Sequence, residues 1–301
     1  MKHLFELVSK PDNIPIVGLL LLVIFYSWLA WTKARKNDLA QTPEEAKLDD
    51  KVQVWPYLVR VEFLAMILVL FILVVWSVFI NAPLEAPANP SLTPNPSKAP
   101  WYFLGLQELL VYFDPWIAGV VLPSIIIVGL MIIPYVDINE KGNGYYSFKE
   151  RKFAILTFCF GFLILWVSLI VLGTFMRGPG WNFFLPWEDW DLHKVVVLNN
   201  VDLSEYFGMP THHPDNSLNI AASIFGFLFI AAFYLGLGGW HYMKYKSSDV
   251  VKKLGLGRYT LVLGLFLTMM FVVLKIVLRL APPFLGAYPV KYIWVTPWFN
   301  V

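Results

Sequence analysis

Six long apolar stretches alternate along the chain with charged, proline-rich or otherwise polar segments. Each comes close to the roughly 20 residues that an α-helix needs to cross the hydrocarbon core of a bilayer. They cover residues 14–31, 58–80, 117–136, 153–175, 218–240 and 259–280. The pattern predicts an all-α integral membrane protein with about six transmembrane helices.

The composition supports this prediction. Hydrophobic residues make up 58% of the 301 residues and charged residues only 15%, whereas soluble domains carry about 25% charged residues. The net charge of +2 is too small to indicate nucleic-acid binding. The first apolar stretch is followed by Trp31, Lys33 and Arg35 rather than by a small-residue cleavage site, so we interpret it as a retained helix.

The distribution of lysine and arginine predicts the orientation. About two thirds of the 23 basic residues lie in the segments after the first, third and fifth helices. Because cytoplasmic loops are enriched in Lys and Arg, these segments are expected to face inward. Both termini and the long loops 81–116 and 176–217 then face the outer, positive side. In a bacterium this predicts a multi-pass protein of the inner membrane with periplasmic termini.

The first outer loop has an unusual sequence. Six prolines from Pro83 to Pro100 forbid regular helix and favour a stiff extended course. Residues 101–113 are then predicted to form a short amphipathic helix at the interface, with Trp101, Gln107 and Glu108 close to one face. Such a helix could form the wall of a site for a flat, lipid-soluble ligand. The alternative is an interfacial belt of aromatic residues with no ligand.

Residues 54–137 resemble the C-terminal half of cytochrome b, which occurs as a separate chain, subunit IV, in some quinol–cytochrome c and plastoquinol–plastocyanin reductases. The resemblance extends through the following helix to residue 175, and it rests on Trp55-Pro56, the run EAPANPSLTP at 85–94, PWYF at 100–103 and Pro134-Tyr135. It implies that the Trp-Tyr pair lines the quinol oxidation site on the positive side. This site would lie between a haem and a docked Rieske protein.

One position departs from the pattern of the family. The motif is usually Pro-Glu-Trp-Tyr, and its glutamate is thought to accept a proton from quinol, but Pro100 stands at that position here. Glu108 is the best local substitute, since a carboxyl group at a water-poor interface can act as a base near neutral pH. Glu85 and Asp114 are further candidates. The alternative for Glu108 is a water-facing position on an amphipathic helix.

The predicted site therefore has two parts. Glu108 is the candidate proton acceptor, and Tyr102 is the second candidate catalytic residue. The residues expected to contact the quinone are Pro100, Trp101, Tyr102, Leu104 and Gln107. The substrate class is quinol, menaquinol among the candidates.

The chain lacks the residues for other cofactors. Transmembrane b-haems are held by histidines on facing helices, and none of the five histidines here lies mid-membrane. A single cysteine, Cys159, excludes a disulfide, a thiolate iron–sulfur cluster and a thiolate zinc site within the chain. The resemblance implies that haem b and the iron–sulfur cluster belong to partners. These would be a haem-bearing four-helix subunit like the N-terminal half of cytochrome b, a Rieske protein and a c-type cytochrome, in a dimeric complex.

Three regions are predicted. They are an N-terminal helix with a charged inner linker (1–53), the subunit IV-like region (54–176), and an outer aromatic loop with two extra helices and a tail (177–301). Lys275, inside the last helix, is expected to snorkel toward the outer interface. The tail is expected to pack along partner chains rather than to form another helix.

The outer loop near residues 176–194 combines three tryptophans with Glu188, Asp189 and Asp191. It suits docking of a basic or haem-bearing electron carrier, or membrane anchoring by the tryptophans alone. The most specific interpretation of the whole chain is a membrane subunit of a bacterial cytochrome bc-type quinol oxidoreductase. The alternatives are a quinone-interacting anchor of an unrelated respiratory complex and, less in keeping with the few polar groups in its membrane core, a transporter.

Overall fold

The computed structural model describes residues 2–40, 52–82, 84, 87, 90, 98–142, 144–191, 194, 196 and 200–301. Within these residues, six helical segments are long and apolar enough to cross a membrane: Ile14–Leu39, Val54–Phe79, Ile117–Val136, Lys152–Met176, Ile220–Tyr245 and Asp249–Pro283. The all-α membrane fold predicted from the sequence is confirmed. The first helix runs past Trp31 to Leu39, because lysine and arginine are good helix formers and no proline or glycine interrupts them.

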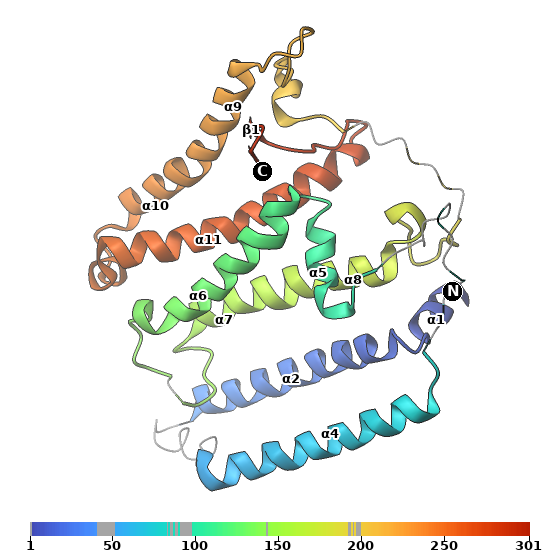
Figure 1. Ribbon diagram of the computed structural model, residues 1–301. Coiled ribbons are helices and arrows are strands. Elements are labelled where there is room, and N and C mark those ends of the chain that lie inside the picture. Colours follow the sequence, from blue (N-terminus) through green and yellow to red (C-terminus); the bar gives the residue numbers. More distant parts are fainter. Residues whose placement is uncertain are drawn as a thin grey trace. The chain divides into compact units, whose positions relative to one another are not determined.

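The chain divides into two compact units. The first contains residues 1–97, 139–163 and 174–194, and the second contains residues 98–138, 164–173 and 195–301. The ribbon in Figure 1 shows the helices of both units in sequence colours.

The first unit is built from long helices and their connecting segments. Its elements are α1 (Lys2–Val8), α2 (Ile14–Leu39), η1 (Val54–Leu58), α4 (Val59–Phe79), α7 (Lys152–Phe158), η5 (Pro179–Trp181) and the first part of η3 (Cys159–Trp166). The carboxylate of Asp38 at the end of α2 accepts hydrogen bonds from Ser147 Oγ at 2.7 Å and from the main-chain nitrogens of Phe148 and Lys149 at 3.1 and 2.9 Å. These bonds attach the loop before α7 to the C-terminal end of α2.

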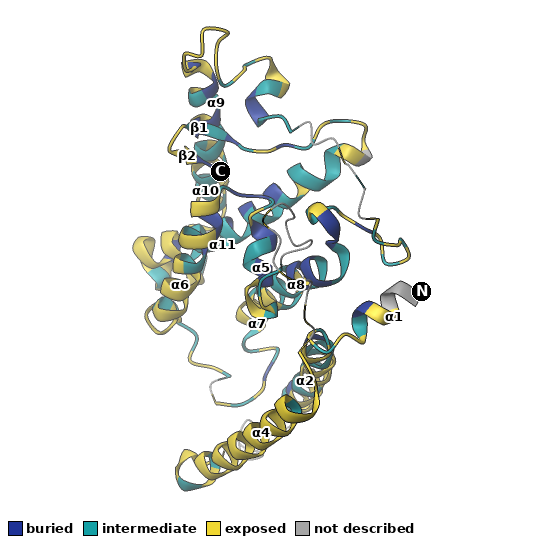
Figure 2. Cartoon of the chain, turned by 45° about the vertical axis from the view of Figure 1, so that its right-hand side comes forward, coloured by how far each residue is buried: buried dark blue, intermediate teal, exposed yellow. Residues whose placement is uncertain are grey.

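The helix α4 has apolar side chains on all its faces and no buried residue. Figure 2 shows it as an almost entirely exposed helix. A helix that is hydrophobic all round needs an apolar environment. For α4 that environment is lipid or the helices of partner chains.

The second unit contains a hydrophobic core. Its elements are α5 (Trp101–Leu109), η2 (Ile117–Val121), α6 (Leu122–Val136), α8 (Val167–Val171), η6 (Leu203–Phe207), α9 (Ile220–Ala231), η7 (Ala232–Gly236), α10 (Leu237–Tyr245), α11 (Asp249–Phe284), β1 (Trp294–Thr296) and β2 (Phe299–Asn300); η4 (Leu172–Met176) begins in this unit. The core joins the end of α5 to α11 and to the C-terminal tail, and its buried members include Leu109, Phe113, Phe271 and Ile293.

The C-terminal tail packs on helices of its own chain. Strands β1 and β2 pair antiparallel, and β1 lies against α9. A Cβ atom added at Gly226 would lie 1.8 Å from the carbonyl oxygen of Trp294. Only glycine allows the strand to approach α9 this closely. The tail forms no further helix, as predicted.

Candidate functional site

The start of α5 is fixed by its proline lead-in and by one side chain. Pro100 precedes the helix in an extended conformation, and its carbonyl oxygen accepts the first-turn hydrogen bond from Phe103 N at 2.9 Å. Gln107 Oε1 accepts a hydrogen bond of 2.7 Å from Ala99 N. Gln107, predicted to contact quinone, therefore ties the residue before Pro100 to the second turn of α5.

Three aromatic residues form the exposed side of this helix start. Tyr102 and Phe103 are 52% and 51% exposed, and Trp101 is half-buried. The rings of Trp101 and Tyr102 meet edge to face with centroids 5.7 Å apart, and those of Tyr102 and Phe103 are 4.6 Å apart. The result is a continuous aromatic surface after a stiff turn. Phe103 was not among the predicted contacts, although it is the last residue of the PWYF run.

The opposite side of α5 packs on α8 and on its neighbouring turns. A Cβ atom at Gly105 would lie 3.2 Å from the indole of Trp166, and one at Gly173 would lie 2.9 Å from Leu104 Cγ. Leu104 is 2% exposed. Its side chain is therefore part of the α5–α8 packing and is covered within this chain, whereas Tyr102 and Phe103 are open.

Glu108 lies on the buried side of α5. It is 0% exposed, and its Oε1 accepts a hydrogen bond of 2.9 Å from the hydroxyl of Tyr112, which is itself buried. The alternative of a water-facing residue is wrong. A buried carboxyl group needs such partners, because burying a polar group without hydrogen bonds is costly.

Glu108 and Tyr102 point to different sides of the helix. Six residues at 3.6 residues per turn correspond to about 120° around the helix axis, in agreement with the burial of Glu108 and the exposure of Tyr102. Among the other candidate carboxylates, Asp114 is partly buried, and its Oδ1 accepts a hydrogen bond of 3.2 Å from Trp116 N. Glu85 lies outside the described residues.

Comparison with known families identifies the region that contains α5. Residues 87–179 match the family model for cytochrome b(C-terminal)/b6/petD. This part of the chain is similar to the C-terminal region of cytochrome b. The match confirms the resemblance found in the sequence, and it includes PWYF, α5, α6 and the helix Lys152–Met176. Trp55-Pro56 and α4 lie outside it. No solved structure matches the chain.

The match indicates the class of protein to which this region is similar. Cytochrome b proteins of this type are subunits of bc- and b6f-type membrane complexes that act on quinones, and they work together with other subunits. Residues 87–179 are similar to this family, and the described residues contain six helices long and apolar enough for a multi-pass membrane protein. The match covers about a third of the chain, and the two last helices and the tail lie beyond it.

Lys275, which lies after the matched residues 87–179, does not adopt the interfacial position that the sequence predicted. Lys275 in α11 is 1% exposed, and its Nζ donates hydrogen bonds to the main-chain oxygens of Lys291 and Val301 at 3.0 and 2.9 Å. The same nitrogen lies 5.7 Å from the ring centroid of Phe113 and 5.9 Å from that of Tyr292. Lys275 does not snorkel; the tail supplies its partners.

Titratable groups surround this lysine at the end of α11. Asp202 Oδ1 accepts a hydrogen bond of 3.2 Å from Tyr292 N. The pKa of Asp202 is raised, first by burial and then by the nearby charge of Glu205. The hydrogen bond from Tyr292 N and the charges of Lys291 and Lys275 lower the pKa but do not cancel this rise. Burial also raises the pKa of Tyr292. Sequence reasoning missed this cluster, for which an intramembrane lysine was the only signal.

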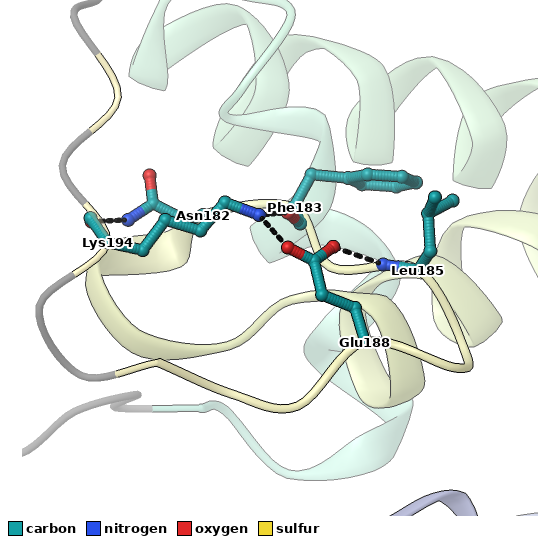
Figure 3. A network of polar contacts seen from close by, with 5 residues as sticks. All are labelled: Asn182, Phe183, Leu185, Glu188 and Lys194. Atoms are coloured by element: carbon teal, nitrogen blue, oxygen red, sulfur yellow. Dashed lines mark hydrogen bonds and ion pairs between the residues drawn. The ribbon is translucent and has the colours of Figure 1, made fainter. Parts of the chain in front are cut away.

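The loop that follows the matched residues 87–179 is held by Lys194 (Figure 3). Its Nζ lies 2.7 Å from Glu188 Oε1 and donates to the carbonyl oxygen of Phe183 at 2.9 Å, while Asn182 Nδ2 donates to the carbonyl oxygen of Lys194 at 2.8 Å. The hydrogen bond from Lys194, with one from Leu185 N, lowers the pKa of Glu188. The charge of Glu188 is therefore used within the loop; Asp189 and Asp191 are exposed at the surface.

His212 and His213 are neighbours in the chain, whereas His241 lies in α10. The ring of His212 contacts Trp294 at a centroid distance of 5.4 Å, and His241 Nδ1 lies 2.6 Å from the hydroxyl of Tyr259. His193 lies outside the described residues. In the part of the chain that the structure describes, no group of three or more His, Cys, Asp or Glu side chains is placed to hold a metal ion.

Proposed function

We propose that the chain is a subunit of a bacterial quinol oxidoreductase of the cytochrome bc type, and that α5 forms one wall of its outer-side quinol oxidation site. The observation that carries the proposal is the exposed aromatic surface of Trp101, Tyr102 and Phe103 within the matched region. Flat aromatic surfaces suit a quinone ring, and the hydroxyl of Tyr102 can hydrogen-bond to a quinol oxygen.

The structure supports a division of roles in this wall. Pro100 and the bond from Ala99 N to Gln107 Oε1 hold the lead-in in place, and the packing of Leu104 and Gly105 on α8 holds the helix. These residues position the aromatic surface, and the ring contacts come from Trp101, Tyr102 and Phe103. A site held by packed neighbours loses less entropy when the ligand binds.

Glu108 is proposed to accept one of the two protons released by quinol. It is the carboxyl group within α5, and the hydroxyl of Tyr112 hydrogen-bonds to it. Since Glu108 faces away from Tyr102, the proton must reach it from the side of α5 that carries Tyr112. Asp114 is the second candidate, five residues after Leu109 and at the start of the next helix. Electrons and the remaining proton would pass to groups on partner chains.

The proposed partners are those that the resemblance to subunit IV implies. They are a four-helix subunit that carries haem b, a Rieske iron–sulfur protein and a c-type cytochrome, in a dimeric complex in the inner membrane. Both ends of the chain would face the periplasm, since six spans return the chain to its starting side. Residues 1–53, 54–176 and 177–301 would be its three functional regions.

A binding measurement tests the wall. In the purified complex, Tyr102→Ala and Phe103→Ala should each raise the KM for quinol several-fold, because each removes exposed ring surface. Leu110→Ala removes an exposed apolar side chain just after α5 and serves as the control, for which KM should stay unchanged. If Tyr102→Ala and Phe103→Ala leave the KM at the parental value, the exposed side of α5 does not bind quinol.

A further inference from the structure

The turn that joins α10 to α11 is strongly basic. Residues 244–258 contain five cations and one carboxylate, Asp249. All five cations are exposed: Lys244, Lys246, Lys252, Lys253 and Arg258. Among the residues that the structure describes, none of them forms an ion pair with an acidic side chain. We call residues 244–258 the basic turn.

The orientation of the helices does not account for this charge. Loop 137–152, on the same side of the predicted membrane, has four basic residues but also three acidic ones, Asp137, Glu140 and Glu150. A modest excess of Lys and Arg satisfies the rule that orients transmembrane helices. The basic turn has a larger excess of Lys and Arg than this rule requires, and all five of its cations lie within residues 244–258.

The basic turn is held in a defined conformation. Lys246 N donates to Tyr242 O at 2.8 Å, Ser248 N donates to Tyr245 O at 2.9 Å, and Ser248 Oγ accepts a hydrogen bond of 3.3 Å from Val251 N. Gly255 has φ +70° and ψ 167°, a conformation that favours glycine, and it breaks α11 after its first turns. Figure 1 shows α10 and α11 joined at this turn. Lys246 thus lies in the turn itself, and the other four cations lie on the adjoining ends of α10 and α11 rather than on a long loop.

Apolar and aromatic side chains accompany the cations. Met243, Val250 and Leu256 are exposed, and the Nζ of Lys244 lies 5.1 Å from the ring centroid of Trp240 and 5.4 Å from that of Tyr245. A surface for a free anion has no need of exposed aliphatic side chains. Cations beside aliphatic and aromatic groups at the end of two membrane helices fit a molecule with an anionic head and acyl chains.

We propose that the basic turn is a binding site for an anionic phospholipid. Lys252, Lys253 and Arg258 bind the phosphodiester group, and Val250 and Leu256 contact the acyl chains. Lys244 and Lys246 extend the positive surface on the α10 side. The site lies in the part of the chain beyond the cytochrome b C-terminal match, and the proposal stands independently of quinol oxidation.

Lipid binding to the intact complex tests this proposal. The complex is reconstituted in nanodiscs of phosphatidylcholine with a small share of fluorescent phosphatidylglycerol, and lipid bound next to the protein is measured by energy transfer from a label at Ser247→Cys. The variant Lys252→Gln/Lys253→Gln/Arg258→Gln should lower the apparent affinity for phosphatidylglycerol at least tenfold, since each cation near an anionic surface contributes roughly a fivefold factor. Lys252→Arg/Lys253→Arg should retain it.

The matched control is Lys141→Gln/Lys149→Gln/Lys152→Gln, which removes the same charge from loop 137–152 and should leave the signal within about twofold of the parent value. Equal losses in both triple variants would overturn the proposal, because they would show only a general attraction to anionic membranes. Competition by millimolar inorganic phosphate would also overturn it in favour of a free-anion site. If an acidic subunit covers the label in the intact complex and keeps lipid away from it, the basic turn binds a protein partner and the proposal is overturned.

Discussion

The Nζ of Lys275 donates a hydrogen bond of 2.9 Å to the main-chain oxygen of Val301, 26 residues further along the chain. A second bond, 3.0 Å long, goes to the main-chain oxygen of Lys291. One buried ammonium group thus holds two points of the tail. The tail residues Ile293 and Val301 belong to the same hydrophobic core as Leu109 and Phe113 at the end of α5. The region beyond the cytochrome b match therefore supports the helix that carries the proposed quinol wall.

Loss of this amine should release the tail. Lys275→Met leaves two main-chain oxygens, one part-buried and one buried, without their charged donor, and a hydrogen bond from a charged group contributes about 1.5–3 kcal/mol. We expect the amide hydrogens of Ile293 and Val301, which donate to each other's carbonyl oxygens, to exchange at least tenfold faster. Lys291→Met removes an exposed amine and keeps the main-chain oxygen, so its exchange rates should match the parent. Unchanged exchange in Lys275→Met would show that packing alone holds the tail.

Gly226 provides a steric test of the same contact. Gly226→Ala places a Cβ atom 1.8 Å from Trp294 O, so β1 must move away from α9. We expect a loss of about 1–3 kcal/mol, as for other overpacked sites, seen as a lower midpoint of thermal unfolding in detergent. Gly236→Ala, where the added Cβ meets nothing within 4 Å, should keep or slightly raise the midpoint. Equal midpoints for the two variants would contradict the close approach of β1.

The sequence predicted the helices better than the polar contacts, for a physical reason. Span length and hydrophobicity are local properties, so all six membrane helices could be found without the structure. The burial of Glu108 depends on the hydroxyl of Tyr112 and on how α5 packs on α8. The partners of Lys275 lie 16 and 26 residues away, in a tail without a regular pattern. The aromatic start of α5 was predictable because its residues are adjacent; the side on which its carboxylate lies was not.

Spectroscopy tests the assignment of haem to partners. The described histidines offer no facing pair within the membrane spans: His212 and His213 are adjacent in the second outer loop, and His241 contacts Tyr259. The chain expressed and purified alone should therefore show no low-spin b-type haem spectrum. A b-haem signal at one haem or more per chain would contradict this assignment and the proposed four-helix partner. Co-expression with that partner is the positive control.

Cysteine labelling tests the proposed orientation. In a Cys159→Ala background, Asp189→Cys in the outer aromatic loop should react with a membrane-impermeant maleimide on intact cells. Ser247→Cys in the basic turn should react only after the membrane is opened. Both positions are exposed, so a difference in labelling reports the side of the membrane and not burial. The reverse pattern would invert the topology and place α5 on the cytoplasmic side.

The last prediction concerns proton transfer at Glu108. General acid–base assistance contributes about 10²–10⁴-fold to a rate, and glutamine keeps the size of the side chain and an acceptor for the hydroxyl of Tyr112. Glu108→Gln should therefore lower quinol–cytochrome c turnover at least tenfold, an order-of-magnitude bound from that range, with little change in the KM for quinol and with normal assembly. Removing a group that acts only in the transition state lowers kcat rather than binding.

Two further variants separate this role from a structural one. Tyr112→Phe removes the 2.9 Å hydrogen bond to Glu108 but keeps the carboxyl group, so it should slow turnover less than Glu108→Gln and should shift the pH profile of kcat. Asp114→Asn tests the second candidate acceptor in the same assay. If Glu108→Gln turns over at the parental rate from pH 6 to 8 and Asp114→Asn is slow, the proton leaves through Asp114. The Glu108–Tyr112 pair would then serve the packing of α5 alone, because a buried carboxyl group with a satisfied hydrogen bond can remain in place without exchanging its proton during turnover.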